Sequence, residues 1–189
     1  MRDILIRYIK RFTDFTEGEL ETIVSDVPIE EFKKGTILLE QGEVPVKCYF
    51  VLKGCVRQFS INEDGKENTF NFFTEEQPVN IFNQHTLDKA SKYSLSCTED
   101  CVLVVGDLSI EQQMYDKYSG LETMTRKLFE ENIGEMHDNF AEFISSRPEE
   151  RYQSLLNNRP DLITRVPQHQ LASFLGITPE SLSRIKRRL

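Results

Sequence analysis

The sequence contains no tryptophan, and only three histidines and four cysteines among its 189 residues. It has no run of about 18 apolar residues, which excludes a membrane-spanning helix. The N-terminal stretch MRDILIRYIKRF alternates charged and apolar side chains and lacks a continuous apolar segment and a small-residue cleavage site, so we expect no secretory signal. These absences predict a soluble, cytoplasmic protein without a membrane segment.

The few cysteines and histidines offer little to a metal site or a catalytic centre. Cys97 and Cys101 lie four residues apart, which would suit a metal or redox pair, but no CxxC motif or nearby histidine accompanies them. We therefore expect buried thiols rather than a disulfide framework. His85, His137 and His169 fall in separate segments without a plausible serine, cysteine or carboxylate constellation. The sequence predicts no enzyme, no metal site and no cofactor.

Positive charge is scarce over most of the chain but not at its C-terminal end. The net charge of −8, taken alone, argues against a nucleic-acid partner. Residues 147–189, however, hold eight Lys/Arg and four Asp/Glu, a net charge of +4, whereas the other 146 residues hold 15 basic and 27 acidic side chains, a net charge of −12. This distribution predicts a basic terminal segment on an acidic body.

Strand patterns follow helical ones along the first half of the chain. Apolar residues at helical spacing predict a helix near the N-terminus, and Thr16 with Glu19 has the form of a capping box that begins a second helix. From 29 to 108, short runs rich in Val, Ile, Phe and Tyr alternate with turn residues, and Asp64-Gly65 is a strong hairpin signal. Such strands predict an antiparallel sandwich or jelly roll made of two closed sheets.

A helical pattern returns after these strands. A short helix over 109–115 precedes a long one over 118–145, which would extend about 40 Å. One small sandwich does not need so long a helix, so we interpret it as a dimerisation helix, with an internal spacer as the alternative. Polar Asn132 and Glu135 in the same stripe weaken a pure coiled-coil interpretation. The apolar residues that predict the dimer seam are Leu121, Met124, Leu128 and Met136.

The last residues, HQLASFLGITPESLSRIKRRL, have the spacing of a helix–turn–helix unit. Small Ala172 allows two helices to cross closely, and Gly176 supplies the left-handed conformation that ends the first helix. Thr178 caps the second helix, and Pro179 occupies its first position, where a missing N–H costs nothing. An ordinary helical hairpin is the alternative, but it leaves the basic face of the second helix unexplained. The residues that bury the seam are Leu171, Leu175, Leu182 and Ile185.

This unit predicts a protein that binds double-stranded DNA. Residues near the start of the second helix reach base edges in the major groove, so Arg184 would contact guanine and Glu180 a cytosine amino group. Basic residues further along would lie against phosphates. The candidate DNA-binding residues are Gln168, His169, Thr178, Pro179, Glu180, Ser181, Ser183, Arg184, Lys186, Arg187 and Arg188.

On these motifs the chain resembles the Crp/Fnr family of bacterial transcription regulators over nearly its whole length. FKKGTILLEQGE and CYFVLKGCVRQFSINEDGKE are similar to the family's cyclic-nucleotide-binding jelly roll, with glycines where its turns fall. The resemblance implies an α+β fold with three parts: a jelly-roll sensor domain over 1–117, a dimerisation helix over 118–146 and a small all-α helix–turn–helix domain over 147–189. It also implies a homodimer that binds a pseudo-palindromic operator and recruits or blocks RNA polymerase.

The sensor part departs from the family pattern. TEEQPVNIFNQHTLDKASKYSLSC replaces the phosphate-binding cassette and lacks its Gly-Glu and its arginine, and Lys92 cannot supply the bidentate contacts of a guanidinium. We therefore predict that cyclic AMP is not a ligand, and leave an unknown small-molecule effector and no effector equally open. No cysteine precedes Cys48, which argues against the iron–sulfur centre of the oxygen-sensing branch. Candidate effector-pocket residues are Phe72, Phe82, Lys92 and Tyr93.

The DNA-binding part departs from the pattern as well. The family's β-hairpin wing after the recognition helix is missing because the sequence ends at Leu189, so we expect weaker binding or dependence on the dimer. Pro179 stands where many relatives have arginine, which predicts a different operator preference. A small-molecule sensor or interaction protein that has lost DNA binding is the alternative function.

Overall fold

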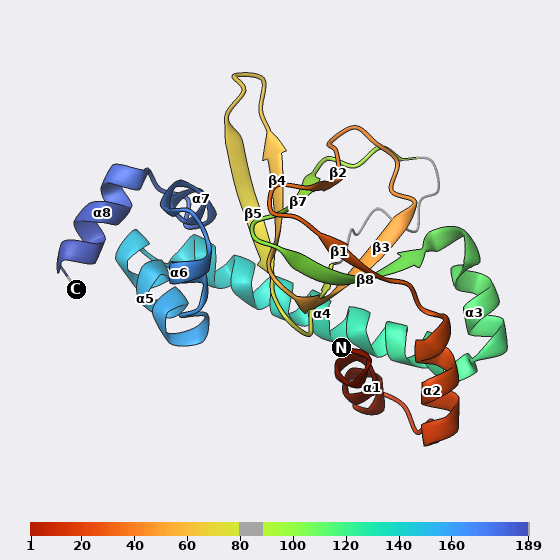
Figure 1. Ribbon diagram of the computed structural model, residues 1–189. Coiled ribbons are helices and arrows are strands. Elements are labelled where there is room, and N and C mark those ends of the chain that lie inside the picture. Colours follow the sequence, from red (N-terminus) through yellow and green to blue (C-terminus); the bar gives the residue numbers. More distant parts are fainter. Residues whose placement is uncertain (80–88, 189) are drawn as a thin grey trace.

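The computed structural model describes residues 1–79 and 89–188. Its strands form two four-stranded antiparallel sheets packed face to face, one in the order β1-β8-β3-β6 and the other in the order β2-β7-β4-β5 (Figure 1). The predicted α+β fold with an antiparallel sandwich is therefore confirmed. The strands are β1 Ile29–Phe32, β2 Ile37–Leu39, β3 Lys47–Lys53, β4 Val56–Ile61, β5 Glu67–Phe73, β6 Pro78–Val79, β7 Ser94–Cys97 and β8 Cys101–Asp107.

Alternating side chains from both sheets fill the centre of the sandwich. Val51, Leu95 and Leu103 are fully buried there, as expected for β-branched and aliphatic residues on inward-facing positions. The β4–β5 hairpin turns at Gly65, whose φ of 75° suits glycine. The Asn62 side chain supports this turn by accepting hydrogen bonds from the backbone N–H groups of Asp64 and Lys66. The predicted hairpin is thus confirmed, and it projects from the sandwich (Figure 1).

Helices precede and follow the sandwich. The predicted capping box is present, because the Thr16 N–H donates to Glu19 Oε2 at 2.8 Å and the Glu19 N–H donates to Thr16 Oγ1 at 3.4 Å. Short helix α6 was not predicted. The helices are α1 Arg2–Lys10, α2 Glu17–Asp26, α3 Glu111–Lys117, α4 Ser119–Ser145, α5 Pro148–Asn158, α6 Leu162–Arg165, α7 Gln168–Phe174 and α8 Pro179–Arg188, with a 3₁₀ turn at Leu108–Ile110.

The first half of α4 packs against α1, α2 and the sandwich. Leu121 is buried in a cluster that joins α4 to α1, α2 and strands β3 and β8, and the Tyr8 and Phe50 rings meet within that cluster at 4.5 Å between centroids. The second half continues past the sandwich to the terminal helices (Figure 1). Among the described residues, no helix combines the length and apolar character needed to cross a membrane.

The terminal helices α5–α8 share their core with the sandwich. Leu162, Leu171 and Leu182 are almost fully buried among these helices. The same cluster includes Phe72 from β5 and Cys55 from the turn that precedes β4. The segment predicted as a separate domain over 147–189 therefore packs directly on the sandwich.

Candidate nucleic-acid interface

Helices α7 and α8 form the predicted helix–turn–helix. The turn is a Schellman motif: the Ile177 N–H donates to the Ala172 carbonyl and the Gly176 N–H to the Ser173 carbonyl, both at 3.0 Å. Gly176 has φ +69°, which glycine adopts without the strain that a Cβ would add. Thr178 begins α8 by accepting a hydrogen bond from the Ser181 N–H at 3.2 Å. The predicted roles of Gly176 and Thr178 are confirmed.

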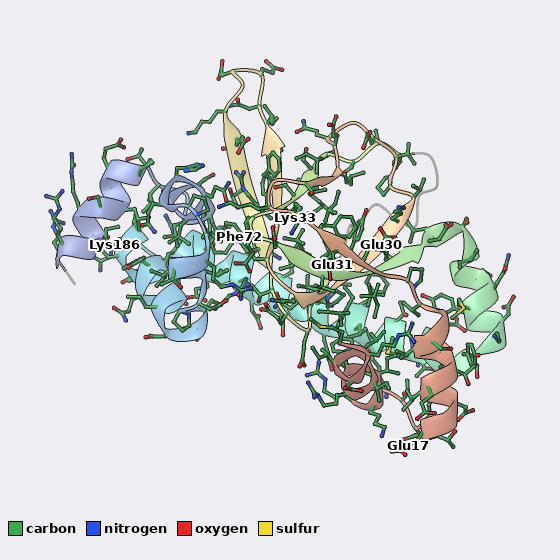
Figure 2. All side chains as sticks on the ribbon, viewed as in Figure 1. Glu17, Glu30, Glu31, Lys33, Phe72 and Lys186 are labelled. Carbon is green, nitrogen blue, oxygen red and sulfur yellow. The ribbon has the colours of Figure 1, made fainter. Side chains whose placement is uncertain are left out.

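One face of α8 is apolar and the opposite face is basic. Leu182 and Ile185 are buried against α7, which leaves the cationic side chains in solvent. Lys186, labelled in Figure 2, is linked to the start of α7, because its Nζ donates to Gln168 Oε1 at 2.7 Å. The exposed cations of α8 are Arg184, Lys186, Arg187 and Arg188.

The structure brings the predicted DNA-binding residues together on the first turn of α7, the following turn and α8. All are exposed except half-buried Ser181. Glu180 accepts a hydrogen bond from its own backbone N–H at the start of α8, and this bond, with the Thr178 hydroxyl and nearby Arg184, holds its pKa below the usual range. Glu180 is thus an anionic acceptor at neutral pH, as the predicted cytosine contact requires. A shallow depression is bounded by Pro179, Glu180, Ser183, Arg184 and Arg187.

Three arginines of the basic terminal segment have structural partners instead of facing solvent. Arg151 donates to backbone carbonyls at helix ends, Arg159 donates to the Phe72 carbonyl at 2.8 Å, and Arg165 pairs with carboxylates. The sequence-based count of eight cations therefore overstates the charge available to DNA, and the free positive charge concentrates on α8.

Arg165 joins the terminal helices to the sandwich by ion pairs. It forms two hydrogen bonds with Glu75, from Nη2 to Oε1 and from Nη1 to Oε2, both 2.8 Å long, and its Nε donates to Glu99 at 3.1 Å. Burial alone would raise the pKa of Glu75, but the hydrogen bonds from Arg165 and the Gly54 N–H outweigh it and hold that pKa below the usual range. Nothing in the sequence pattern signals these pairs, because the partners lie 66 and 90 residues away.

Strand β5 provides the rest of this contact. The Thr69 N–H at this sheet edge donates to Ser173 Oγ on α7 at 2.9 Å, which satisfies an otherwise unpaired edge group. The Phe72 and Phe174 rings pack edge to face with centroids 5.5 Å apart. Figure 2 labels Phe72 where β5 faces the terminal helices. Helix α7 is thus held by the sandwich on one side and by α8 on the other.

The predicted effector-pocket residues that the structure describes lie in different surroundings. Fully buried Phe72 packs among the terminal helices, whereas its neighbour Phe73 fills the sandwich core. Successive residues of a strand point to opposite faces, so Phe72, predicted to line an effector pocket in the sandwich, instead faces the terminal helices. Tyr93 is half-buried with its ring edge-on to Phe70 at 5.0 Å. Lys92 is exposed, and Phe82 lies outside the described residues.

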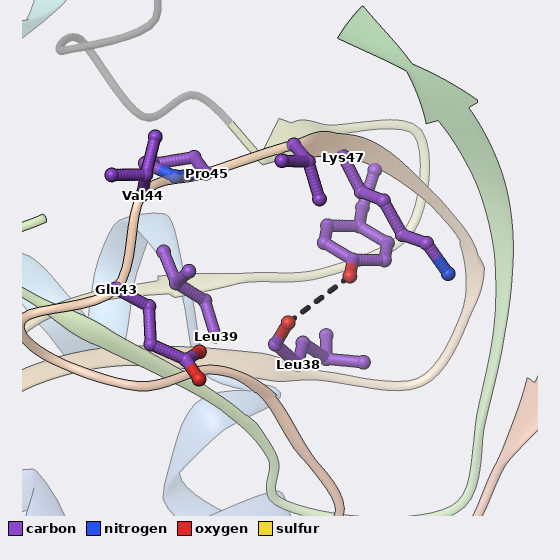
Figure 3. Close-up of a pocket in the computed structure, with 8 residues that line it drawn as sticks. Leu38, Leu39, Glu43, Val44, Pro45 and Lys47 are labelled. Atoms are coloured by element: carbon purple, nitrogen blue, oxygen red, sulfur yellow. Dashed lines mark hydrogen bonds between the residues drawn. The ribbon is translucent and has the colours of Figure 1, made fainter. Parts of the chain in front are cut away.

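The sandwich has a cavity elsewhere, between β2, the following loop and the start of β3. It has a volume of about 230 Å³ and is lined mainly by apolar side chains together with Glu43 and Lys47 (Figure 3). The Tyr49 hydroxyl donates to the Leu38 carbonyl at 3.1 Å, and burial raises the Tyr49 pKa to about 12. Tyr49 therefore stays protonated at neutral pH.

Helix α4 presents an apolar stripe to solvent, but not over the predicted residues alone. Leu121 is buried within the chain, and Met124 and Leu128 pack against the same cluster, so these three already have intramolecular partners. Met136 is half exposed. It belongs to a stripe at spacings of three and four residues, the neighbours of one helical face: Ile133, Met136, Phe140 and Ile144.

The cysteines lie within the described residues, and none forms a disulfide. Cys55, Cys97 and Cys101 are buried, so the prediction of buried thiols holds for these three. Desolvation raises the pKa of Cys55 to about 11, which keeps the thiol protonated and unreactive at neutral pH. In the described part of the chain, no group of three or more His, Cys, Asp or Glu side chains is arranged to hold a metal ion.

Comparison with known proteins agrees with this architecture. Residues 29–118 match the model of the cyclic nucleotide-binding domain family. No curated protein matches the chain in sequence.

Solved structures extend the similarity to the whole chain. The c-di-GMP-responsive regulator CLP of Xanthomonas campestris has 16% identity and a TM-score of 0.70, with 92% of this chain and 91% of that chain covered. FixK2 from Bradyrhizobium japonicum has 17% identity and a TM-score of 0.69 over 86% and 84%. CooA from Carboxydothermus hydrogenoformans has 16% identity and a TM-score of 0.67 over 94% and 85%. The fold that the resemblance implies is confirmed: residues 29–118 match the cyclic nucleotide-binding domain family, and nearly the whole chain shares the fold of these three proteins.

Proposed function

We propose that the protein is a sequence-specific DNA-binding transcription regulator that acts as a homodimer and has no catalytic activity. The observation that carries this proposal is the exposed basic face of α8 within a helix–turn–helix whose opposite face is buried. An acidic body repels DNA, so binding needs the cations gathered on one exposed helix. Contact with RNA polymerase, implied by the resemblance, belongs to the same proposal.

The exposed stripe on α4 supports the homodimer. Phe140 and Ile144 expose 65% and 67% of their surface, and soluble monomers rarely leave a contiguous apolar stripe in water. A second copy of α4 covers the stripe if the two helices pair side by side. Parallel pairing also places both terminal units at the same end of the dimer, as a pseudo-palindromic operator requires.

We further propose that cyclic AMP is not the effector. A cyclic phosphate needs a buried cation, and between Arg57 and Arg126 the sequence has no arginine. Arg57 is buried, but its Nε donates to Thr69 at 2.9 Å and its Nη1 pairs with Glu67. Its Nε and Nη1 groups are thus engaged within the β4–β5 pair, and its charge is paired there with Glu67. A thermal-shift titration tests this directly: we expect no change in Tm with cyclic AMP, and a saturable increase would contradict the proposal.

Selection of bound fragments from genomic DNA, followed by affinity measurements at several salt concentrations, tests the function. We expect enrichment of a palindromic site and an affinity that falls steeply with salt, since phosphate contacts release counterions. Arg184→Ala should relax specificity at one base pair by about 1–3 kcal/mol, whereas Arg187→Ala should weaken all sequences alike and reduce the salt slope by about one. Arg147→Ala is the matched control, because this arginine is exposed but lies outside α8. Failure to enrich any palindrome would instead favour a sensor that has lost DNA binding.

A further inference from the structure

The link between α4 and the terminal helices is short and extended. Helix α4 ends at Ser145 and α5 begins at Pro148. Ser146 and Arg147 between them have φ/ψ of −94°/146° and −74°/158°. The following proline restricts Arg147 to extended conformations, but no such restriction applies to Ser146. The backbone alone therefore does not fix the direction in which α5–α8 leave α4, and side-chain contacts must do so.

Arg151 provides such contacts directly between α5 and the ends of α4 and α7. Its Nη1 donates to the carbonyls of Phe143 and Ser146 at 3.1 and 2.9 Å, both at the end of α4. Its Nε donates to the Leu175 carbonyl at 3.0 Å, at the end of α7. One side chain on α5 thus connects the end of the long helix to the end of the first helix of the helix–turn–helix.

The chemistry of this site calls for a guanidinium. Carbonyls in the last turn of a helix lack intrahelical partners, and they carry the negative end of the helix dipole. Two such helix ends converge on Arg151. A guanidinium presents five donors in a rigid planar fork, whereas the lysine ammonium is a point charge on a flexible stem. Arginine can therefore fix the angle between the two helix ends, and lysine can supply only the charge.

A ring contact reinforces the connection. The Arg151 guanidinium lies 4.4 Å from the centroid of the Phe143 ring. The same ring abuts the turn between α7 and α8, where a Cβ on Gly176 would lie only 2.8 Å from Phe143 Cζ. Glycine therefore serves two purposes at this position, since it adopts the left-handed conformation and leaves room for the ring. Rotation of α5–α8 about the linker would break both the hydrogen bonds and this packing.

We propose that Arg151 is a positioning residue that sets the orientation of α8 relative to α4, and with it the half-site spacing that the dimer accepts. The inference rests on the proposed function. If two copies pair along α4, each α8 enters one half-site, and the distance between the two α8 helices follows from the angle at which each terminal unit leaves α4. Operator half-site spacing is a geometric consequence of that distance.

A spacing series tests this inference. Two copies of the selected half-site are separated by distances varied in single base-pair steps, and a duplex with one half-site reports the affinity of a single terminal unit. We expect the wild type and Arg147→Ala to prefer one spacing about tenfold over its neighbours, equivalent to about 1.4 kcal/mol. Arg151→Ala and Arg151→Lys should bind the single half-site within about twofold of wild type but lose most of that preference, to below about threefold.

A measurement without DNA completes the test. Spin labels attached through a genetically encoded keto amino acid at exposed positions Asp138 and Ser183 report the distance between α4 and α8, with labelled protein diluted into unlabelled protein. We expect one narrow distance distribution in the wild type and a broad one in Arg151→Ala. Arg151→Lys, which keeps the charge, should broaden it too, so a loss of folding in the alanine variant alone does not decide the result.

The outcomes separate the two proposals. Wild-type spacing preference and a narrow distribution in both Arg151 variants would overturn the positioning role while leaving DNA binding intact. A wild-type protein that binds no duplex would overturn the proposed function. In that case the spin-label distances still decide whether Arg151 orients α8, and the inference about half-site spacing is lost with the function.

Discussion

Arg165 is expected to hold the terminal helices against the sandwich, and its replacement measures how strongly. The guanidinium forms paired hydrogen bonds with Glu75, donates to Glu99 and lies 3.2 Å from Asp161. Arg165→Gln removes the positive charge but keeps a polar side chain. Three carboxylates then face one another across the contact without their shared cation, so the folded state should lose free energy.

The magnitude follows from the exposure of the partners. The side chains of Glu75 and Glu99 are 41% and 32% exposed, so water screens part of the attraction. Fully exposed ion pairs contribute about 0.2–1 kcal/mol, whereas hydrogen bonds to charged groups contribute about 1.5–3 kcal/mol. The Arg165 side chain is only 21% exposed, which places the total between these limits. We expect Arg165→Gln to lower the free energy of unfolding by about 2 kcal/mol, of which Glu75 accounts for about 1 kcal/mol.

A double-mutant cycle in urea at neutral pH isolates the pair. Wild type, Arg165→Gln, Glu75→Gln and the double variant give the coupling energy, and Arg147→Gln serves as a control that removes an exposed arginine. Repeating the cycle in about 1 M salt should reduce the coupling, because the pair is partly exposed. A coupling below about 0.3 kcal/mol would refute the reasoning, and the terminal helices would then be held on the sandwich by their other contacts, among them Phe72 with Phe174 and Thr69 with Ser173.

Three further predictions concern acid, the turn and the dimer. The pKa of Glu75 in the folded state lies below its usual value of 4.5, so the ionised carboxylate stabilises the fold fully above that pH and loses this effect as the pH falls further. Glu75→Gln should therefore flatten the fall in unfolding free energy at acidic pH. Identical acid limbs of the wild-type and variant stability curves would contradict this. Gly176→Ala should cost about 1–3 kcal/mol in thermal unfolding, because it strains a positive φ and meets the Phe143 ring; an unchanged Tm would count against the packing argument. Phe140→Glu should abolish self-association in sedimentation without destabilising the monomer, since this ring is 65% exposed; persistence of the dimer would move the interface elsewhere.

The helix–turn–helix could be predicted from sequence because its determinants are local. Gly176 satisfies a backbone requirement, Thr178 a capping requirement and Leu182 a helical periodicity, all within a few positions of one another. The same holds for the capping box at Thr16 and the hairpin at Gly65. In each case the backbone geometry requires a particular residue type, so a single residue is enough to indicate the turn or the helix start.

The sandwich face and the arginine partners could not be predicted, because they depend on contacts distant in sequence. Phe72 and Phe73 are equally aromatic, and only the register of β5 decides which one points inward. That register shifts near Gln58, where the β4–β5 pairing is irregular. From the sequence alone, Arg165 is one more basic residue of a DNA-binding segment. Only the folded structure shows that it pairs with Glu75.

The two arginine contacts give the terminal helices two separate attachments. Arg151 fixes them to α4, the helix with the exposed apolar stripe, and Arg165 fixes them to the turn at Glu75, which leads from β5 into β6. A change in the sandwich that displaced Glu75 would release the second attachment and leave the first intact. The terminal unit would then keep its orientation to α4 through Arg151 and Phe143, and through the packing of α7 against Phe72 on β5. The orientation of α8 therefore depends in part on a few directional polar contacts, which makes it more sensitive to single substitutions than the sandwich core is.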